Sequence, residues 1–250
     1  MKVLNLFSVF VIAVLLMSGC IDDDKYAGSY RVSIATVENA DSTNVFFLRL
    51  DNDTLLWTAE SNFTNYKPKT GQRIIANYSL LSDKRATGLY DYDVKLNDVY
   101  EVLTKGIFQI SPDKQDSIGH DSIYVSEMWI GSKFLNVEFL YQGYNKTHFI
   151  NLVSDTAKTY DDEKIHLEFR HNANNDYPMN NRWGIVSFDI SSIQSTTVDS
   201  VNLVIHVNVP NQAEEELYEL TYYYNLPSSG IKRKSKSSAF QNYIKTEELR

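Results

Sequence analysis

Short runs in which every second residue is apolar recur along this chain, and they constrain its fold more than any other feature. The longest run is the stripe of alternate apolar residues from Val201 to Val209, and another places Ile165, Leu167 and Phe169 on one face. Period-two patterns are typical of strands that turn one face toward a core. The 17 Tyr and 12 Phe residues favour the same structure, because aromatic side chains fit a pleated, half-buried surface. No amphipathic helix of three turns stands out, so we predict an all-β fold.

The spacing of these runs indicates antiparallel sandwiches or barrels rather than alternating strands and helices, since turn-forming residues separate them at short intervals. Asp51-Asn52-Asp53 predicts a hairpin turn. In the first run, Val32 and Ile34 are expected on the core face. The predicted strands are 31–37, 45–50, 54–58, 73–81, 94–102, 122–129, 133–141, 148–153, 165–170, 183–190, 201–209 and 216–224.

A polar segment, Ser111–Asp121, lies between two strand-rich halves and contains Pro112 and Gly119. Such a segment is either a linker between domains or a long loop within one domain. Residues 116–228 carry 6 basic and 16 acidic residues, whereas the half before them is nearly balanced, and this change of charge favours a linker. The basic, Ser-rich run 232–236 predicts a disordered tail over 228–250.

The first residues are typical of a bacterial lipoprotein signal peptide, 1–19. Lys2 precedes a mostly apolar run of about 15 residues, which is shorter than the roughly 20 needed to span a bilayer. Small residues then precede Cys20, the only cysteine of the chain, which excludes an intramolecular disulfide. We predict that Cys20 is lipidated and that acyl chains anchor the mature protein to a membrane.

Three aspartates, Asp22, Asp23 and Asp24, directly follow the predicted anchor in an acidic tether, 20–25. One interpretation is a solvated spacer. The other is a sorting signal, because acidic residues at this place resemble the signal that sends lipoproteins of gut-dwelling Gram-negative anaerobes to the outer face of the outer membrane. We expect the protein at the outer membrane and on the cell surface, with the periplasmic face as the alternative.

Several segments together resemble the NigD-like lipoproteins. Gly71–Leu81 reads GQRIIANYSLL and Tyr92–Tyr100 reads YDVKLNDVY, and Trp129–Val137, Ile165–Asn172 and Ser187–Ile190 follow in the family's order. The resemblance covers about 26–226. It implies an N-terminal five-stranded OB-type barrel, 26–113, followed by a C-terminal β-sandwich, 119–227, in an acylated envelope protein. It supplies no functional residues, although the family's link to a bacteriocin gene region suggests an immunity or accessory role.

A metal site is the first chemical hypothesis to weigh. His166 and Glu168 lie two residues apart on one strand face, and His206 on a neighbouring strand is a possible third ligand. Zinc needs three or four converging ligands, and a solvated face with an Arg–Glu pair explains the pattern more simply. The acidic run Asp161-Asp162-Glu163 lacks the spacing of a calcium loop. We therefore predict no metal and no cofactor.

Catalytic residues are not indicated either. Ser79, Ser187 and Ser191 lack the Gly-x-Ser-x-Gly setting of a nucleophile elbow, and no phosphate-binding or dinucleotide-binding glycine motif occurs. The net charge of −8 argues against nucleic acid as a partner, because phosphate binding needs clustered Lys and Arg.

Aromatic residues offer the best candidate for binding. Tyr90, Tyr92 and Tyr100 form a possible ligand platform, since OB-type barrels bind oligosaccharides or oligonucleotides on one strand face and its loops. The alternative is ordinary strand packing with every second Tyr exposed. Trp129 and Trp183 are expected in the core of the sandwich.

Six Ser or Thr residues follow an Asp in triplets that resemble the O-glycosylation acceptor motif of the same anaerobes' envelope proteins. The alternative is chance, because Asp, Ser and Thr are all turn formers. The six are Ser42, Thr54, Ser117, Ser122, Thr156 and Ser200.

The sequence thus favours a non-catalytic, membrane-anchored surface or periplasm-facing lipoprotein that binds a glycan or protein partner. Two alternatives stay open: an enzyme acting on envelope polymers, and a structural accessory subunit of an outer-membrane complex. A cleft with converging carboxylates would favour the enzyme. An exposed aromatic strip would favour binding, and a large apolar patch would favour a complex.

Overall fold

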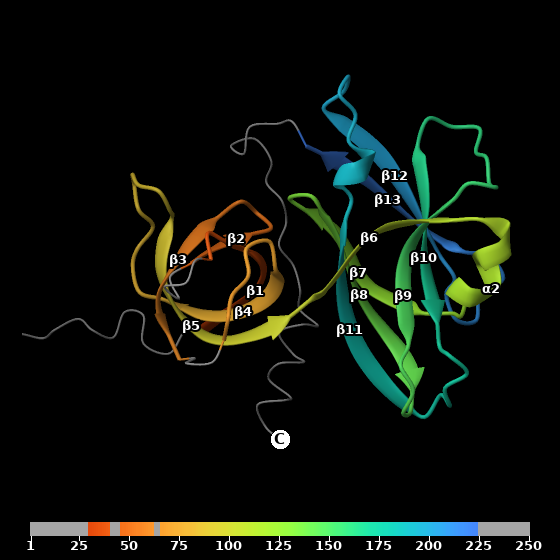
Figure 1. The fold of residues 1–250 in the computed structure, drawn as a ribbon, viewed down its shortest axis with the longest axis horizontal. Helices are drawn as coiled ribbons and strands as arrows, with labels where there is room; N and C mark the ends of the chain where they lie inside the picture. The colour runs from red at the N-terminus through yellow and green to blue at the C-terminus, as the bar shows by residue number, and fades with distance from the viewer. Residues whose placement is uncertain (1–29, 41–45, 63–65, 225–250) are drawn as a thin grey trace, which may run out of the picture.

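The computed structural model describes residues 30–40, 46–62 and 66–224, which form two β bodies side by side (Figure 1). The first is a closed five-stranded barrel with the strand order β1-β2-β3-β5-β4. The second is an eight-stranded sheet with the order β13-β12-β10-β9-β6-β11-β8-β7. The all-β prediction and the barrel followed by a sandwich are confirmed.

The barrel consists of β1 (Tyr30–Glu38), β2 (Phe47–Leu50), β3 (Leu55–Ser61), β4 (Arg73–Leu80) and β5 (Tyr92–Glu101). Its interior is filled by aliphatic and aromatic side chains from all five strands, including Ala35, Leu48, Leu56, Ile74 and Val94. β2 and β3 form the predicted hairpin, in which Asp53 adopts a φ of 66° at the turn. The barrel closes because β3 pairs in parallel with β5 and β1 pairs with β4.

The second body consists of β6 (Leu103–Ile110), β7 (Tyr124–Gly131), β8 (Phe134–Gly143), β9 (Phe149–Asp155), β10 (Ile165–Asn172), β11 (Asn180–Asp189), β12 (Ser200–Val207) and β13 (Glu216–Tyr223). The sheet folds over into two layers, and its edge strands β7 and β13 contact each other. The core lies between the layers and includes Leu135, Phe188, Phe169 and Ile205. The predicted alternation of Ile165, Leu167 and Phe169 therefore does face a core.

β6 is the corner at which the sheet passes from one layer to the other. Its first half, Leu103–Gly106, pairs in parallel with β11, and its second half, Ile107–Ile110, pairs in parallel with β9. Figure 1 shows β6 running out of the barrel and into the middle of the second body. The predicted barrel boundary at residue 113 is therefore corrected. The barrel strands end at Glu101, because β6 pairs only with strands of the sandwich.

The segment Ser111–Asp121 is a connection within the sandwich and not a linker, so the loop interpretation describes it. It contains the short 3-10 helix η1 (Pro112–Lys114) and the helix α2 (Gln115–Ile118). Arg170 of β10 donates hydrogen bonds to the side-chain oxygen of Gln115 at 3.0 Å and to the carbonyl of Gly119 at 3.2 Å. These contacts fix the segment against β10 and bury Arg170 together with Glu168.

Barrel and sandwich share an apolar contact. Ile34, Ile75 and Val102 are buried there, and Val32, Ile185 and the two tryptophans Trp129 and Trp183 pack against them. The alternation of Val32 and Ile34 thus marks the barrel's face toward the sandwich rather than its interior. The expectation that both tryptophans lie in the sandwich core is wrong, because β7 and β11 turn these side chains outward to the barrel.

A buried polar network, which we call the Arg73 network, lies beside this contact. Arg73 of β4 is fully buried and forms a two-point ion pair with Asp51, with nitrogen–oxygen distances of 2.8 and 3.1 Å. It also donates hydrogen bonds to Asn136 of β8 at 2.9 Å and to Ser187 of β11 at 3.4 Å. Asp51 in turn accepts hydrogen bonds from the indole of Trp129 and from Asn136. Two barrel side chains, Arg73 and Asp51, thus join three strands of the other body, β7, β8 and β11.

Candidate binding surface

Three aromatic side chains gather on the outside of the barrel, over β2 and β3. Phe47 and Trp57 are direct partners in the register of the β2–β3 hairpin, so their side chains lie on the same face. Tyr90 reaches them from the connection between β4 and β5, with ring centroids 5.9 Å from Phe47 and 5.4 Å from Trp57. We call these three residues the barrel platform. All three are only partly buried.

Tyr90 is held in place by its own polar contacts. Its hydroxyl donates to Asp93 at 3.0 Å, and the guanidinium of Arg85 lies 4.6 Å from its ring centroid. Burial and the hydrogen bond to Asp93 raise the pKa of Tyr90, which keeps the phenol protonated as a donor. A fixed aromatic ring loses little conformational entropy on binding, which suits a contact surface.

The charges beside the platform are paired. Arg85 forms an ion pair with Asp93 at 2.7 Å, and Arg49 forms one with Glu38 at 2.5 Å. Both guanidinium groups are therefore already paired with carboxylates of the barrel. Next to Tyr90, Leu89 is 87% exposed, which extends the apolar surface. The platform fits a ligand with apolar or C–H faces better than a polyanion.

Of the three predicted platform residues, the structure places only Tyr90 there. Tyr92 begins β5 and packs against the barrel core, and Tyr100 lies near the other end of β5, where it is 44% exposed. Phe47 and Trp57 were not predicted. The hairpin turn at residues 51–53 held the signal for them, because pairing on either side of it sets 47 opposite 57.

His206, the possible third ligand of the metal hypothesis, does lie beside His166, but the carboxylate of Glu168 has other partners. His166 Nδ1 lies 2.9 Å from His206 Nε2, and Asp162 bonds the other nitrogen of His166 at 2.9 Å. Glu168 instead pairs with Arg170 at 2.5 Å and with Lys158 at 2.6 Å, which lowers its pKa despite its burial. Among the residues that the structure describes, no group of three or more His, Cys, Asp or Glu is arranged to hold a metal ion.

The three serines considered as nucleophiles all have structural partners. Ser187 donates to Asn136 inside the Arg73 network, Ser191 donates to Asp189, and Ser79 accepts from Asn97. Ser187 is fully buried, so a substrate has no access to it. The acidic run at 161–163 contributes Asp162 to the histidine pair and is otherwise exposed.

The glycosylation candidates fall at strand ends and turns where they are described. Thr54 closes the β2–β3 turn, Ser122 precedes β7, Thr156 follows β9, and Ser200 opens β12. Ser117 lies in α2. Cys20, Asp22, Asp23, Asp24 and Ser42 lie outside the described residues, as do the tether 20–25 and the tail 228–250.

A closed OB-type barrel joined to a two-layered β-sandwich defines a class of two-domain, all-β proteins. Residues 34–102 match the NigD-like N-terminal OB domain, and residues 106–224 match the NigD-like C-terminal beta sandwich domain. The chain therefore belongs to the NigD-like family. The two matches meet between Val102 and Gly106, which agrees with the place where β6 leaves the barrel.

Solved structures of similar fold include proteins from Parabacteroides and Bacteroides species. A protein from Parabacteroides distasonis described only as toxin-related is 33% identical, with 79% of this chain and 95% of that chain covered and a TM-score of 0.68. A protein of unknown function from Bacteroides vulgatus is 27% identical, with 84% and 97% covered and a TM-score of 0.70. A NigD-like immunity protein from Bacteroides caccae is 18% identical, with 79% and 99% covered and a TM-score of 0.61, and shows the fold alone. Comparison with curated proteins finds no match.

Proposed function

We propose that this chain is a lipid-anchored, non-catalytic protein of the cell envelope that binds a glycan or protein partner through the barrel platform. The observation that carries the proposal is the cluster of Phe47, Trp57 and Tyr90 over β2 and β3, with tilted ring contacts from Tyr90 to the other two. OB-type barrels bind their ligands on the face of the second and third strands and on the loop between the fourth and fifth. Here that face and that loop supply all three rings.

The hydrogen bonds and ion pairs of the candidate catalytic side chains support the proposal of binding without catalysis. Ser187, Glu168 and His166 each engage structural partners within the folded chain. Such groups hold the fold, whereas a general acid or nucleophile needs a reachable reacting atom. The enzyme acting on envelope polymers is thus the less supported alternative.

The proposed anchor rests on the leader and on Cys20. Within the described residues, the structure has no helix of the length and apolarity that crossing a membrane requires. A lipoprotein candidate from Bacteroides fragilis, 12% identical, has the same fold. If Cys20 carries the lipid, Cys20→Ala abolishes labelling by a fatty-acid probe in growing cells. Unchanged labelling would show the anchor to be elsewhere.

A protein toxin is the partner that an immunity role requires. A neighbour of 33% identity is toxin-related and one of 18% identity is called an immunity protein. The same barrel platform would then contact a protein, because aromatic side chains are enriched at interface hot spots. The accessory-subunit alternative predicts instead that the partner is an outer-membrane protein.

Substitution of Trp57 by Ala tests the platform. Removing a central aromatic anchor costs roughly 2 kcal/mol of binding free energy, about a thirtyfold loss of affinity. The matched control is Tyr100→Ala, an exposed aromatic on the same barrel outside the platform. Partners are cross-linked in intact membranes, purified with each variant and quantified by mass spectrometry.

The expected result is a partner that is retained by the wild type and by Tyr100→Ala and lost with Trp57→Ala. Circular dichroism confirms that each variant is folded. Equal recovery with a folded Trp57→Ala variant would remove the platform from the binding surface.

A further inference from the structure

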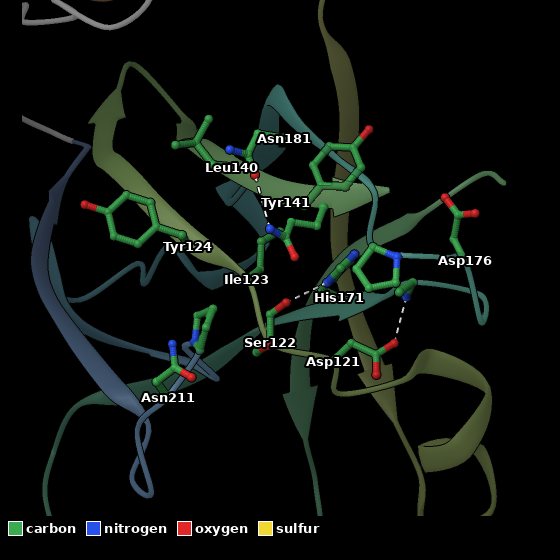
Figure 2. A pocket seen from close by; sticks show the side chains of 14 residues that line it. Asp121, Ser122, Ile123, Tyr124, Leu140, Tyr141, His171, Asp176, Asn181 and Asn211 are labelled. Atoms are coloured by element: carbon green, nitrogen blue, oxygen red, sulfur yellow. Dashed lines mark hydrogen bonds between the residues drawn. The ribbon is translucent and has the colours of Figure 1, made fainter. Parts of the chain in front are cut away.

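A pocket of about 640 Å³ opens at one end of the sandwich. Its lining residues belong to the sandwich, whereas the barrel platform belongs to the barrel. The pocket lies where β7 begins and β8 ends, and the β10–β11 and β12–β13 connections form its other walls (Figure 2). Its volume falls in the range of small-molecule and oligomer sites. No sequence motif pointed to it, because its walls come from four separate parts of the chain.

The charge of the pocket excludes anions as its ligand. In the part of the chain that the structure describes, its lining contains no Lys or Arg, and the carboxylates that line it are Asp121 and Asp176. Asp121 accepts the backbone N–H of Ala173 at 2.7 Å. Asp176 accepts the N–H groups of Tyr144 and Asn145, and these bonds hold its pKa well below the usual range although burial acts in the opposite direction. An anion would meet two fixed negative charges here.

Cations are not favoured either, because both carboxylates already have donors. The polar groups that remain available include amides and phenols. Among the described residues, neither Tyr124 nor Asn211 makes a side-chain hydrogen bond, and Tyr124 is 56% exposed. Gln142 and Asn181 pair with each other at 3.3 Å and keep further donor and acceptor capacity. Each of these groups both donates and accepts, which matches neutral hydroxyl groups.

Apolar surface alternates with these polar groups around the opening. Leu140 is the register partner of Tyr124, and Pro178 and Pro210 line the neighbouring walls. Figure 2 shows the rings of Tyr124 and Tyr141 on opposite sides of Leu140 and Ile123. A sugar ring presents C–H faces and hydroxyl edges, so it can use flat apolar walls and amide groups at once.

The side chains at the floor of the pocket favour binding over catalysis. His171 Nε2 lies 2.8 Å from His148 Nδ1, and His171 Nδ1 lies 3.1 Å from the carbonyl oxygen of Ser122. Both ring nitrogens of His171 are therefore engaged, and burial lowers its pKa. The second nitrogen of His148 bonds Asp176 at 3.2 Å. This chain of bonds stiffens the floor and leaves neither imidazole free as a base.

We propose that the pocket at the end of the sandwich binds a neutral oligosaccharide. It is a second site, on the other body from the barrel platform, and it does not depend on the function proposed for the platform. Tyr124 and Asn181 contact the sugar directly, through the phenol ring and the amide.

Titration with defined sugars tests the proposal. The probes are the neutral hexasaccharides of glucose (α-1,4 and β-1,4 linked), mannose, xylose and N-acetylglucosamine, with hexagalacturonic acid as the anionic probe and a neutral Gly/Ser hexapeptide as the peptide probe. Binding is followed by calorimetry and by NMR of the labelled mature chain. We expect at least one neutral sugar to bind and to shift the signals of Tyr124 and Asn211, and we expect the anionic sugar and the peptide not to bind.

Two variants locate the binding. Tyr124→Ala and Asn181→Ala each lower the affinity for the neutral sugar tenfold or more, whereas Trp57→Ala of the platform leaves it unchanged. The proposal is overturned if no neutral sugar binds. It is equally overturned if the peptide or the anionic sugar binds as tightly, or if folded Tyr124→Ala and Asn181→Ala variants bind like the wild type. The two proposals can fail separately. A Trp57→Ala variant that loses the partner supports the platform function, whatever the sugar titration shows.

Discussion

Replacing Arg73 by Met should strongly destabilise the protein. The guanidinium is fully buried, and its removal leaves Asp51, which is 14% exposed, without its ion-pair partner. It also removes the donors to Asn136 and Ser187. Removing one member of a buried pair costs roughly 3–5 kcal/mol, because the other charge stays desolvated. With a urea m-value of about 2 kcal/mol/M, the unfolding midpoint falls by about 2 M.

Urea unfolding followed by tryptophan fluorescence measures this directly, since Trp129 donates to Asp51 in the same network. The matched control is Arg49→Met, which breaks a pair of similar length on the barrel surface, where the two side chains are 34% and 30% exposed. Surface pairs contribute about 0–1 kcal/mol, so the control shifts the midpoint by less than about 0.5 M.

The double variant Arg73→Met, Asp51→Asn separates the charge from the packing. Replacing the unpaired carboxylate of Asp51 by an amide should recover part of the lost stability, so the effects of the two changes are not additive. Because the network joins the two bodies, Arg73→Met should also broaden or split the unfolding transition. If Arg73→Met lowers stability by less than about 1 kcal/mol, the reasoning from burial and desolvation is refuted.

Two further predictions concern a glycine beside Asp51 and a buried histidine of the sandwich. A Cβ added at Gly131 would overlap the carboxyl group of Asp51, so Gly131→Ala should cost roughly 1–3 kcal/mol, and Gly106→Ala, which meets open space, should melt like the wild type. Burial lowers the pKa of His171, so the unfolded chain takes up this proton first as the pH falls below about 6.5, and stability declines from there through the lower folded pKa. Urea midpoints measured between pH 7.5 and 5 should show this decline of stability. His171→Gln should make the decline smaller. If the dependence of the midpoint on pH is the same in His171→Gln as in the wild type, other groups cause the decline.

Most strands were predictable because their contacts are local. The β2–β3 and β7–β8 hairpins combine alternating faces with turn residues, and both signals lie within a few residues of each other. β6 was missed because its residues Leu103–Ile110 are mostly exposed, contain Gly106 and show no clean alternation. Its assignment depends on parallel pairing with β9 and β11, which the residues of β6 itself do not encode.

The candidate sites follow the same rule: what depends on a local pattern was predicted, and what depends on contacts between distant segments was not. Tyr90 was predicted from composition, but its partners Phe47 and Trp57 required the register of the barrel. His166 and His206 were placed together correctly by alternation on neighbouring strands. The expected Arg–Glu pair is also present, as Arg170 with Glu168, but it is buried and does not lie on a solvated face. The pocket at the end of the sandwich was beyond prediction, since it exists only after four connections meet.

The place of β6 in the sheet has a consequence for how the chain is made. Leu103 pairs with Val186 and Ile107 with Leu152, so the middle strand of the sandwich leaves the ribosome long before either of its neighbours. The barrel strands, in contrast, are complete once β5 has emerged. β6 must therefore wait with both edges open while β7 and β8 are synthesised, and its edge toward β11 stays open until β10 has also been made, which is a period of exposure to wrong pairing. Non-local parallel pairing is slow, so insertion of β6 should limit the folding rate of the sandwich and make it depend on chaperones that shield open strand edges.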